Sequence, residues 1–405
     1  MPTYSLTSLY AARAAGITGS VIDSSTSLLQ RQAHDVVRMA MGSPAAEAIP
    51  GDVFAALLAD VVADRDAPSA FDYGPTEGEA ELRRALLDFL ERQGTPVDPD
   101  ELLITSGGMQ GLDLVAKLFV EAGDLVAVES PTYTNGTATM SGYEGRLVEI
   151  PGDEQGMDVD ALEWAADEHG EPPKLIYTIP TFQNPAGTTL SLERRLRLIE
   201  LAADWGAVVL EDDPYGLLRF EGDDLPTLRQ LGAGRVRVLG VRTFSKMLAP
   251  GLRVGWVEAE PEIVARMIDA RQGMDTCTAP AMQRLVARFL TGGHADAHLA
   301  ALRAEYRRRK IGLQAALRDE LPALEATWTD PEGGFFLWLT LPEAIDTEEL
   351  FPLALEEGVA YIPGPAFSIG GRFANALRLA FSAEPPERAR VGVRRLARAI
   401  VRQLG

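Results

Sequence analysis

The chain has 405 residues, of which 46% are hydrophobic and 24% are charged, as in an ordinary globular protein. Its formal net charge of −21 argues against nucleic acid or an anionic membrane as a partner, because both are polyanions. Its one cysteine, Cys277, excludes an internal disulfide framework. We therefore expect a cytoplasmic protein with neither a secretory signal nor a membrane span.

The N-terminal part of the chain predicts helices. Apolar residues recur at helical spacing over 54–62 and again over 82–90. Residues 71–78 lie between these helices and are rich in turn formers. Thr76 or Glu77 is expected to cap the second helix.

From about residue 100, short apolar runs alternate with helical patterns. This alternation predicts an α/β domain with a mostly parallel, seven-stranded sheet. The strands are expected at 102–105, 125–128, 146–150, 175–178, 208–210, 236–241 and 253–257. Helices are expected between several of them, at 110–119, 192–205 and 261–271.

After about residue 290 the pattern changes to that of a smaller α+β domain. Helices are expected at 296–317, 346–357 and 386–404, and strands at 333–339, 359–362 and 376–381. We predict a large domain over 46–290. The small domain then comprises 1–45 and 291–405.

Polar residues follow five of the predicted strands. They are Ser106, Tyr133, Asn184, Asp212 and Lys246. Ligands of parallel α/β sheets bind beyond the carboxyl ends of the strands. The sequence therefore predicts that these side chains share one pocket.

Lysine is scarce in this chain: only four of its 38 basic residues are lysines. Lys246 lies between Ser245 and a downstream arginine, Arg253, in a run that also contains glycine and proline. An amine in this setting suits a phosphate-bearing aldehyde cofactor, because the amine forms a Schiff base while serine and arginine bind the phosphate. The alternative is a solvated loop lysine.

Several motifs together resemble the class I/II aminotransferases of the fold-type I pyridoxal-phosphate enzymes. They are Tyr73-Gly74-Pro75, Ser106-Gly107-Gly108-Met109-Gln110, Pro131-Thr132-Tyr133, Gln183-Asn184-Pro185, Glu211-Asp212-Asp213-Pro214-Tyr215 and the run from Arg242 to Trp256. The resemblance extends from about residue 38 to the end of the chain. It is strongest to the branch that contains 2-aminoadipate aminotransferases and the aminotransferase-like domains of MocR-type regulators.

The resemblance implies the following cofactor contacts. Lys246 is the Schiff-base lysine and also moves the proton between the substrate α-carbon and the cofactor. Ser245 and Arg253 bind the phosphate together with the helix start at Gly108 and Met109. Relatives often carry a hydroxyl or amide side chain at those last two positions. This chain carries neither, so contact there is expected through the backbone alone.

The ring of the cofactor is assigned to four other residues. Asp212 pairs with the protonated pyridine nitrogen, which keeps the ring an electron sink. Tyr215 and Asn184 hydrogen-bond the phenolic oxygen, and Tyr133 stacks on the ring face. Two alternatives remain: Asp212 with its neighbour Asp213 as a helix cap, and Tyr133 as a packing residue.

Arg378 matches the arginine that binds the substrate α-carboxylate, next to Asn184. A planar guanidinium suits bidentate carboxylate recognition, whereas the alternative is a surface salt bridge. Tyr73 matches a tyrosine that reaches the phosphate of a neighbouring subunit. This implies a homodimer with shared active sites.

The donor side chain is predicted from Asp23, in Ser20-Val21-Ile22-Asp23, where aminoadipate-type relatives have an arginine. An anion there disfavours glutamate-like donors and favours a basic or hydroxylated side chain. Met41-Gly42-Ser43-Pro44 also departs from the relatives' pattern. The alternative for Asp23 is a surface helix cap.

The predicted function is thus a ping-pong exchange of an amino group between an L-amino acid and a 2-oxo acid. A lyase, decarboxylase or oxidase would use the same cofactor residues. A ligand-sensing, non-catalytic MocR-like domain is a further alternative, which the acidic charge disfavours. His294 and His298 are four residues apart, but no acidic ligand accompanies them and no metal is predicted.

Overall fold

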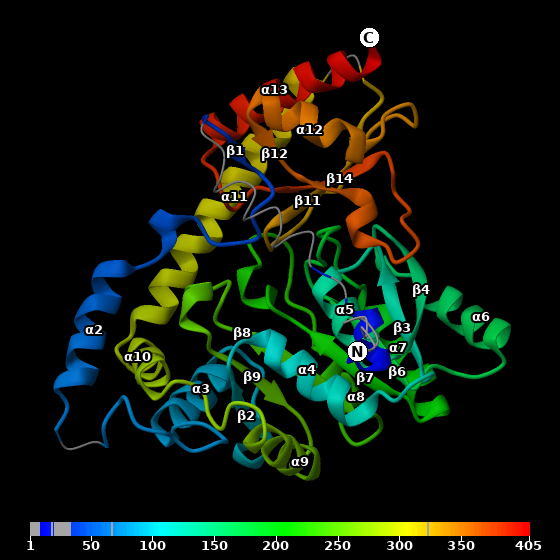
Figure 1. Cartoon of the computed structure of the whole chain (residues 1–405). Helices are drawn as coiled ribbons and strands as arrows, with labels where there is room; N and C mark the ends of the chain where they lie inside the picture. The colour runs from blue at the N-terminus through cyan, green and yellow to red at the C-terminus, as the bar shows by residue number, and fades with distance from the viewer. Residues whose placement is uncertain (1–8, 18, 20–33, 66–67, 322–323) are drawn as a thin grey trace, which may run out of the picture.

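A computed structural model describes residues 9–17, 19, 34–65, 68–321 and 324–405. Its largest feature is an eight-stranded sheet in the order β2-β9-β8-β7-β6-β3-β4-β5 (Figure 1). The strands are β2 (Leu102–Thr105), β3 (Leu125–Ser130), β4 (Arg146–Asp153), β5 (Gly156–Met157), β6 (Leu175–Thr178), β7 (Val208–Asp212), β8 (Val238–Thr243) and β9 (Gly255–Glu258).

The sheet is mostly parallel, as expected. β8, β7, β6, β3 and β4 run parallel, whereas β9 is antiparallel to both of its neighbours. Seven of the strands lie where the sequence predicted them. The eighth, β5, is a two-residue strand that pairs antiparallel with the end of β4.

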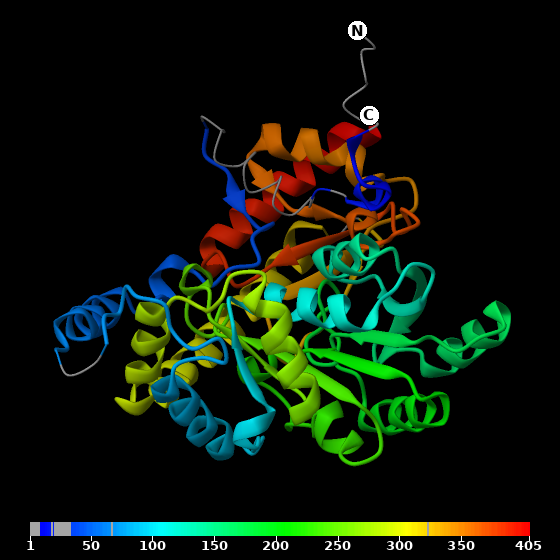
Figure 2. The same cartoon turned by 60° about the horizontal axis from the view of Figure 1, so that its bottom comes forward.

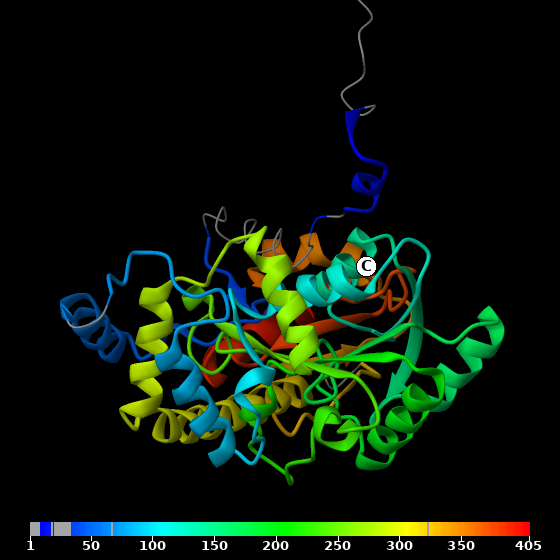
Figure 3. The ribbon, with the colours of Figure 1, turned by 90° about the horizontal axis from the view of Figure 1, so that it is seen from below.

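Helices cover both faces of this sheet, and the central strands are buried on both sides (Figures 2 and 3). One face packs against α4 (Gly108–Phe119) and α9 (Pro261–Gln272), through residues such as Tyr177 and Val241. The other face packs against α6 (Val159–His169) and α7 (Leu192–Trp205). Burial on both faces explains the continuous apolar runs in the sequence.

A smaller sheet has the order β10-β11-β14-β13. Its strands are β10 (Thr327–Trp328), β11 (Phe336–Thr340), β13 (Ile362–Pro363) and β14 (Ala376–Ala380); β1 (Val37–Arg38) pairs separately with β12 (Val359–Ala360). The helices α12 (Thr347–Glu357) and α13 (Pro386–Leu404) pack beside it. α11 (His294–Glu320) runs from α10 (Pro280–Thr291) to α13 and links the two sheet regions (Figure 1).

The remaining helices are α2 (Gly51–Ala63), α3 (Ala80–Arg92), α5 (Thr134–Gly142) and α8 (Leu228–Gly232). The expected cap of α3 at Thr76 or Glu77 is wrong. The N-cap is Glu79, and its backbone N–H donates to Gln283 Oε1 at 2.8 Å, so a side chain of α10 replaces a local cap. In the part of the chain that is described, no helix has the length and apolarity needed to cross a membrane.

Candidate active site

One cavity of about 230 Å³ lies at the carboxyl ends of the parallel strands. Most of the sequence-predicted site residues line it: Gly108, Met109, Tyr133, Asn184, Asp212, Tyr215, Ser245, Lys246, Arg253 and Arg378. They come from five segments of the large sheet region and from β14 of the small one. The cavity therefore lies between the two sheet regions.

Lys246 lies in the turn that follows β8. Its Nζ donates a hydrogen bond to the Gly42 carbonyl oxygen at 2.6 Å, so the N-terminal segment closes the cavity over the amine. Burial, together with the nearby charges of Arg378 and Arg253 and against the opposing charge of Asp212, lowers the pKa of Lys246 to about 8. A neutral amine is thus accessible close to physiological pH.

Hydrogen-bond donors suited to a phosphate gather at the start of α4. The first N–H groups of this helix, at Gly108 and Met109, have no acceptor within the helix. Arg253 lies beneath, with its Nη2 donating to the Ser106 carbonyl oxygen at 3.1 Å. Gly107 has φ +88°, and a Cβ there would lie 2.4 Å from Arg253 Nη2. Glycine is therefore required for the guanidinium to lie against this turn.

The hydroxyl of Ser245 completes this end of the cavity. Thr243 Oγ1 donates to Ser245 Oγ at 2.8 Å and accepts from the Ser245 backbone N–H at 3.1 Å. The pair fixes the position of the serine hydroxyl. Backbone amides, a hydroxyl and a guanidinium together form a phosphate-binding set.

Asp212 is the last residue of β7 and is buried at the edge of the cavity. Tyr177 donates its hydroxyl to Asp212 Oδ2 at 2.9 Å. Burial raises the pKa of Asp212 to about 7; the Tyr177 hydrogen bond and the charge of Lys246 oppose this, whereas Asp213 adds to it. A protonated ring nitrogen at this point would favour the carboxylate form.

Two further predicted residues, Tyr215 and Tyr133, form walls of the cavity. Tyr215 is 2% exposed, its ring packs against Phe335 and Phe336, and burial raises its pKa. Tyr133 donates its hydroxyl to Met109 Sδ at 3.6 Å.

Arg378, on β14, is 1% exposed and forms no ion pair with any described residue. Its Nη1 donates to Asn184 Oδ1 and its Nη2 to the Ala40 carbonyl oxygen, both at 2.8 Å, while its Nε has no hydrogen-bond partner in the described part of the chain. The guanidinium stacks 4.0 Å from the Phe336 ring centroid. Burial lowers its pKa to about 10. A buried cation of this kind suits an incoming carboxylate.

Among the described residues, the predicted site residue Tyr73 does not line this cavity and is 83% exposed in the single chain. Asp23 lies outside the described residues. His298, which the sequence analysis considered as a metal ligand, lies with its Nε2 2.7 Å from the Met247 carbonyl oxygen. Its ring packs edge-on against Phe289.

The sequence analysis missed several residues in and next to the cavity. Tyr177, which contacts Asp212 but does not line the cavity, looked like part of an apolar strand. Phe336, which does line the cavity, looked like part of another. Asn135 and Thr243 also line the cavity. The signal for Tyr177 was its polar hydroxyl in a strand buried on both faces, since a buried tyrosine usually has a hydrogen-bond partner.

Comparison with known proteins agrees with this geometry. Residues 37–396 match the family model "Aminotransferase class I and II". The chain is 38% identical to an aromatic-amino-acid aminotransferase of Thermococcus litoralis, over 100% of this chain and 96% of the relative. It is 38% identical to a 2-aminoadipate transaminase of Thermus thermophilus, over 95% and 94%.

Solved structures are similar throughout the chain. One is an alpha-aminoadipate aminotransferase of Thermus thermophilus in complex with N-(5′-phosphopyridoxyl)-L-leucine, with a TM-score of 0.90, 36% identity and 99% coverage of both chains. Another is a kynurenine aminotransferase of Pyrococcus horikoshii, with a TM-score of 0.90, 36% identity and 98% coverage of both.

The chain therefore belongs to the class I and II aminotransferase family. It is a pyridoxal-phosphate-dependent enzyme that exchanges an amino group between an amino acid and a 2-oxo acid. The groups described above fit this cofactor: an amine of lowered pKa, a buried carboxylate and a phosphate-binding helix start.

Proposed function

We propose that Lys246 and Asp212 carry the proton transfers of this transamination. When bound, pyridoxal phosphate supplies an aldehyde for the amino group and a ring that delocalises charge from the α-carbon. Lys246 holds the aldehyde and, as a free amine, moves the proton at the substrate α-carbon. Asp212 holds the proton on the ring nitrogen.

The other residues bind and orient. Ser245, Arg253 and the backbone at Gly108 and Met109 bind the phosphate. Tyr215 and Asn184 bind the phenolic oxygen, and Tyr133 covers the ring face. Arg378, with Asn184 beside it, binds the α-carboxylate.

One observation carries this proposal: Lys246 and Asp212 line the same cavity as Arg378, a buried arginine with no ion-pair partner among the described residues. The test is a half-reaction. The cofactor-loaded enzyme should convert one equivalent of amino donor to its oxo acid, change its visible absorbance, and regain it when a 2-oxo acid is added. Release of ammonia, carbon dioxide or peroxide without an oxo-acid requirement would contradict it.

The preferred donor is proposed to have a basic or hydroxylated side chain, on the strength of Asp23 in the N-terminal segment. The described residues that line the cavity support the exclusion of acidic donors, which is one of the two parts of this proposal. Apart from the proposed carboxylate and phosphate ligands Arg378 and Arg253, and Lys246, they bear no cation that would meet an acidic side chain. Asp23→Arg should improve an acidic donor and weaken a cationic one; unchanged donor ranking would contradict the role.

A homodimer in a reducing cytoplasm, without nucleic acid, is the proposed setting. The exposed ring of Tyr73 supports a site shared between subunits. Mixing Lys246→Ala with Tyr73→Ala subunits should restore activity, because one site of each hybrid then has both native groups. No recovery in verified hybrids would contradict a shared site. The proposed domains are 46–290 and 1–45 with 291–405.

A further inference from the structure

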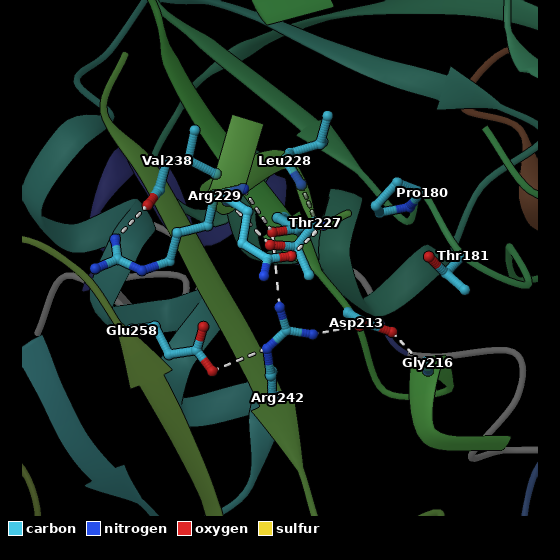
Figure 4. Close-up of polar contacts among 12 residues, drawn as sticks. Pro180, Thr181, Asp213, Gly216, Thr227, Leu228, Arg229, Val238, Arg242 and Glu258 are labelled. Atoms are coloured by element: carbon cyan, nitrogen blue, oxygen red, sulfur yellow. Dashed lines mark hydrogen bonds and ion pairs between the residues drawn. The ribbon is translucent and has the colours of Figure 1, made fainter. Parts of the chain in front are cut away.

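A buried cluster of charges lies on the sheet behind the cavity, and Arg242 is its centre. Arg242 lies on β8, four residues before Lys246, and is 8% exposed. It forms ion pairs with Asp213 and with Glu258 Oε1 at 3.0 Å (Figure 4). A third ion pair joins it to Glu211 Oε2 at 3.7 Å. The two strands that flank β8, β7 and β9, and the turn after β7 thus supply three carboxylates to one guanidinium.

Asp213 connects this cluster to the active site. One of its carboxylate oxygens pairs with Arg242, and the other accepts the Gly216 backbone N–H at 2.7 Å (Figure 4). A Cβ at Gly216 would lie 2.5 Å from Asp213 Oδ2, so glycine allows this close turn. The turn follows Asp212 directly and contains Tyr215. Arg242 therefore anchors a segment that carries two site residues.

The same arginine acts on the charge of Asp212. Asp213 lies beside Asp212 and disfavours its ionised form, whereas Arg242 and Lys246 favour it. The titratable groups that interact with Asp212 are Tyr177 from β6, Glu129 from β3, Tyr215 from the turn after β7, and Asp213, Lys246 and Arg242. Of these groups, only Arg242 also forms an ion pair with Asp213.

We infer that Arg242 is a positioning residue of this transaminase: its guanidinium holds the Asp213–Gly216 turn and offsets the charge of Asp213, so that Asp212 stays a carboxylate. The inference rests on the proposed role of Asp212 at the ring nitrogen. Arg242 itself does not line the cavity that contains Lys246.

The test is the dissociation constant of pyridoxal phosphate, measured by equilibrium dialysis at pH 7 and pH 9. Arg242→Gln removes the offsetting charge, so Asp212 is protonated over a wider pH range and binds the ring nitrogen less well. We expect an affinity loss of roughly tenfold at pH 7, about one pKa unit, that shrinks at pH 9, where Asp212 is ionised again. Adding Asp213→Asn should recover part of the loss.

Arg309→Gln is the matched control. Arg309 is 2% exposed, pairs with Glu47 and with Glu305 at 2.6 Å, and does not line the cavity. It should lose stability without a pH-dependent change in cofactor affinity. The inference is wrong if Arg242→Gln, like this control, shows no pH-dependent loss of cofactor affinity. It is also wrong if the ratio of the variant's dissociation constant to that of the unmodified enzyme is the same at pH 7 and pH 9.

Gly216→Ala tests the turn by itself and keeps every charge, so it remains informative if Arg242→Gln does not fold. We expect kcat to fall roughly tenfold, because the added methyl group displaces the turn and with it Tyr215. The ratio of the cofactor dissociation constants of the variant and the unmodified enzyme should not depend on pH. An unchanged kcat would contradict the inference. Lys246→Ala, measured in parallel, tests the proposed function separately: if it retained turnover, the proposed function and not the role of Arg242 alone would be wrong.

Discussion

Two buried arginines in this molecule have opposite surroundings. Arg242 lies among three carboxylates, and although burial lowers its pKa, those carboxylates outweigh burial and raise it. Arg378 has no carboxylate partner in the described residues, and burial lowers its pKa to about 10. The two side chains differ little in exposure, at 8% and 1%. The difference in partners, and not burial, distinguishes a structural cation from one that awaits a ligand.

The energetic consequences also differ. Removing one partner of a buried ion pair typically costs about 3–5 kcal/mol, because the other charge is left uncompensated. Removing an unpaired buried charge relieves a desolvation cost instead. The charged groups of the cavity are therefore expected to serve ligand binding at little benefit to stability.

The largest effect should come from Lys246→Ala, which removes the amine that acts on the substrate. We expect turnover to fall by at least roughly 10³-fold, because both the covalent contact and the proton transfer are lost. Steady-state assays and circular dichroism check this. If the charged groups of the cavity contribute little to stability, this variant should keep its fold. An unfolded variant would contradict that view.

The pair Arg378→Met and Arg242→Met compares the two arginines directly. Arg378→Met should raise KM for both the amino acid and the oxo acid, by roughly 30-fold or more, since a buried carboxylate pair is worth about 2–5 kcal/mol. Its free energy of unfolding should change by less than about 1 kcal/mol, whereas Arg242→Met should lose about 3 kcal/mol. Equal stability losses in urea denaturation would contradict the comparison.

A smaller effect concerns the pH dependence of the amine. The pKa of Lys246 is lowered to about 8, so the amine is protonated below that pH and neutral above it. Lys117, by contrast, is exposed and has a raised pKa owing to its hydrogen bond with Tyr143. Carbamylation by cyanate of the cofactor-free protein should label Lys246 with a midpoint near pH 8 and Lys117 only at higher pH. Peptide mapping is simple with four lysines; the reverse order would contradict the lowered pKa.

Much of the fold and cavity was readable from sequence for a physical reason. Parallel strands buried on both faces produce apolar runs, and their carboxyl ends meet at one edge. Asp212 and Lys246 were therefore predicted to lie together, and they do. Resemblance added Arg378, which comes from a different sheet and has no such local signal.

The rest depended on tertiary contacts. The cap of α3 comes from Gln283, about 200 residues away, so no local pattern at Thr76 or Glu77 indicated it. Arg242 was read only as the start of the Lys246 run, although a charge inside the strand Val238–Thr243 was itself a sign of buried carboxylates nearby. The positions of Asp23 and Tyr73 relative to a bound substrate stay predictions.

The hydrogen bonds of Arg378 have a consequence for binding entropy. Both of its terminal nitrogens are already held, by Asn184 and by the Ala40 carbonyl oxygen, and its plane rests on Phe336. Immobilising a long side chain during association costs about 0.5–1.5 kcal/mol, and here folding has already fixed it. A ping-pong enzyme binds two carboxylate substrates in turn at this guanidinium, so each visit benefits from the same preorganisation.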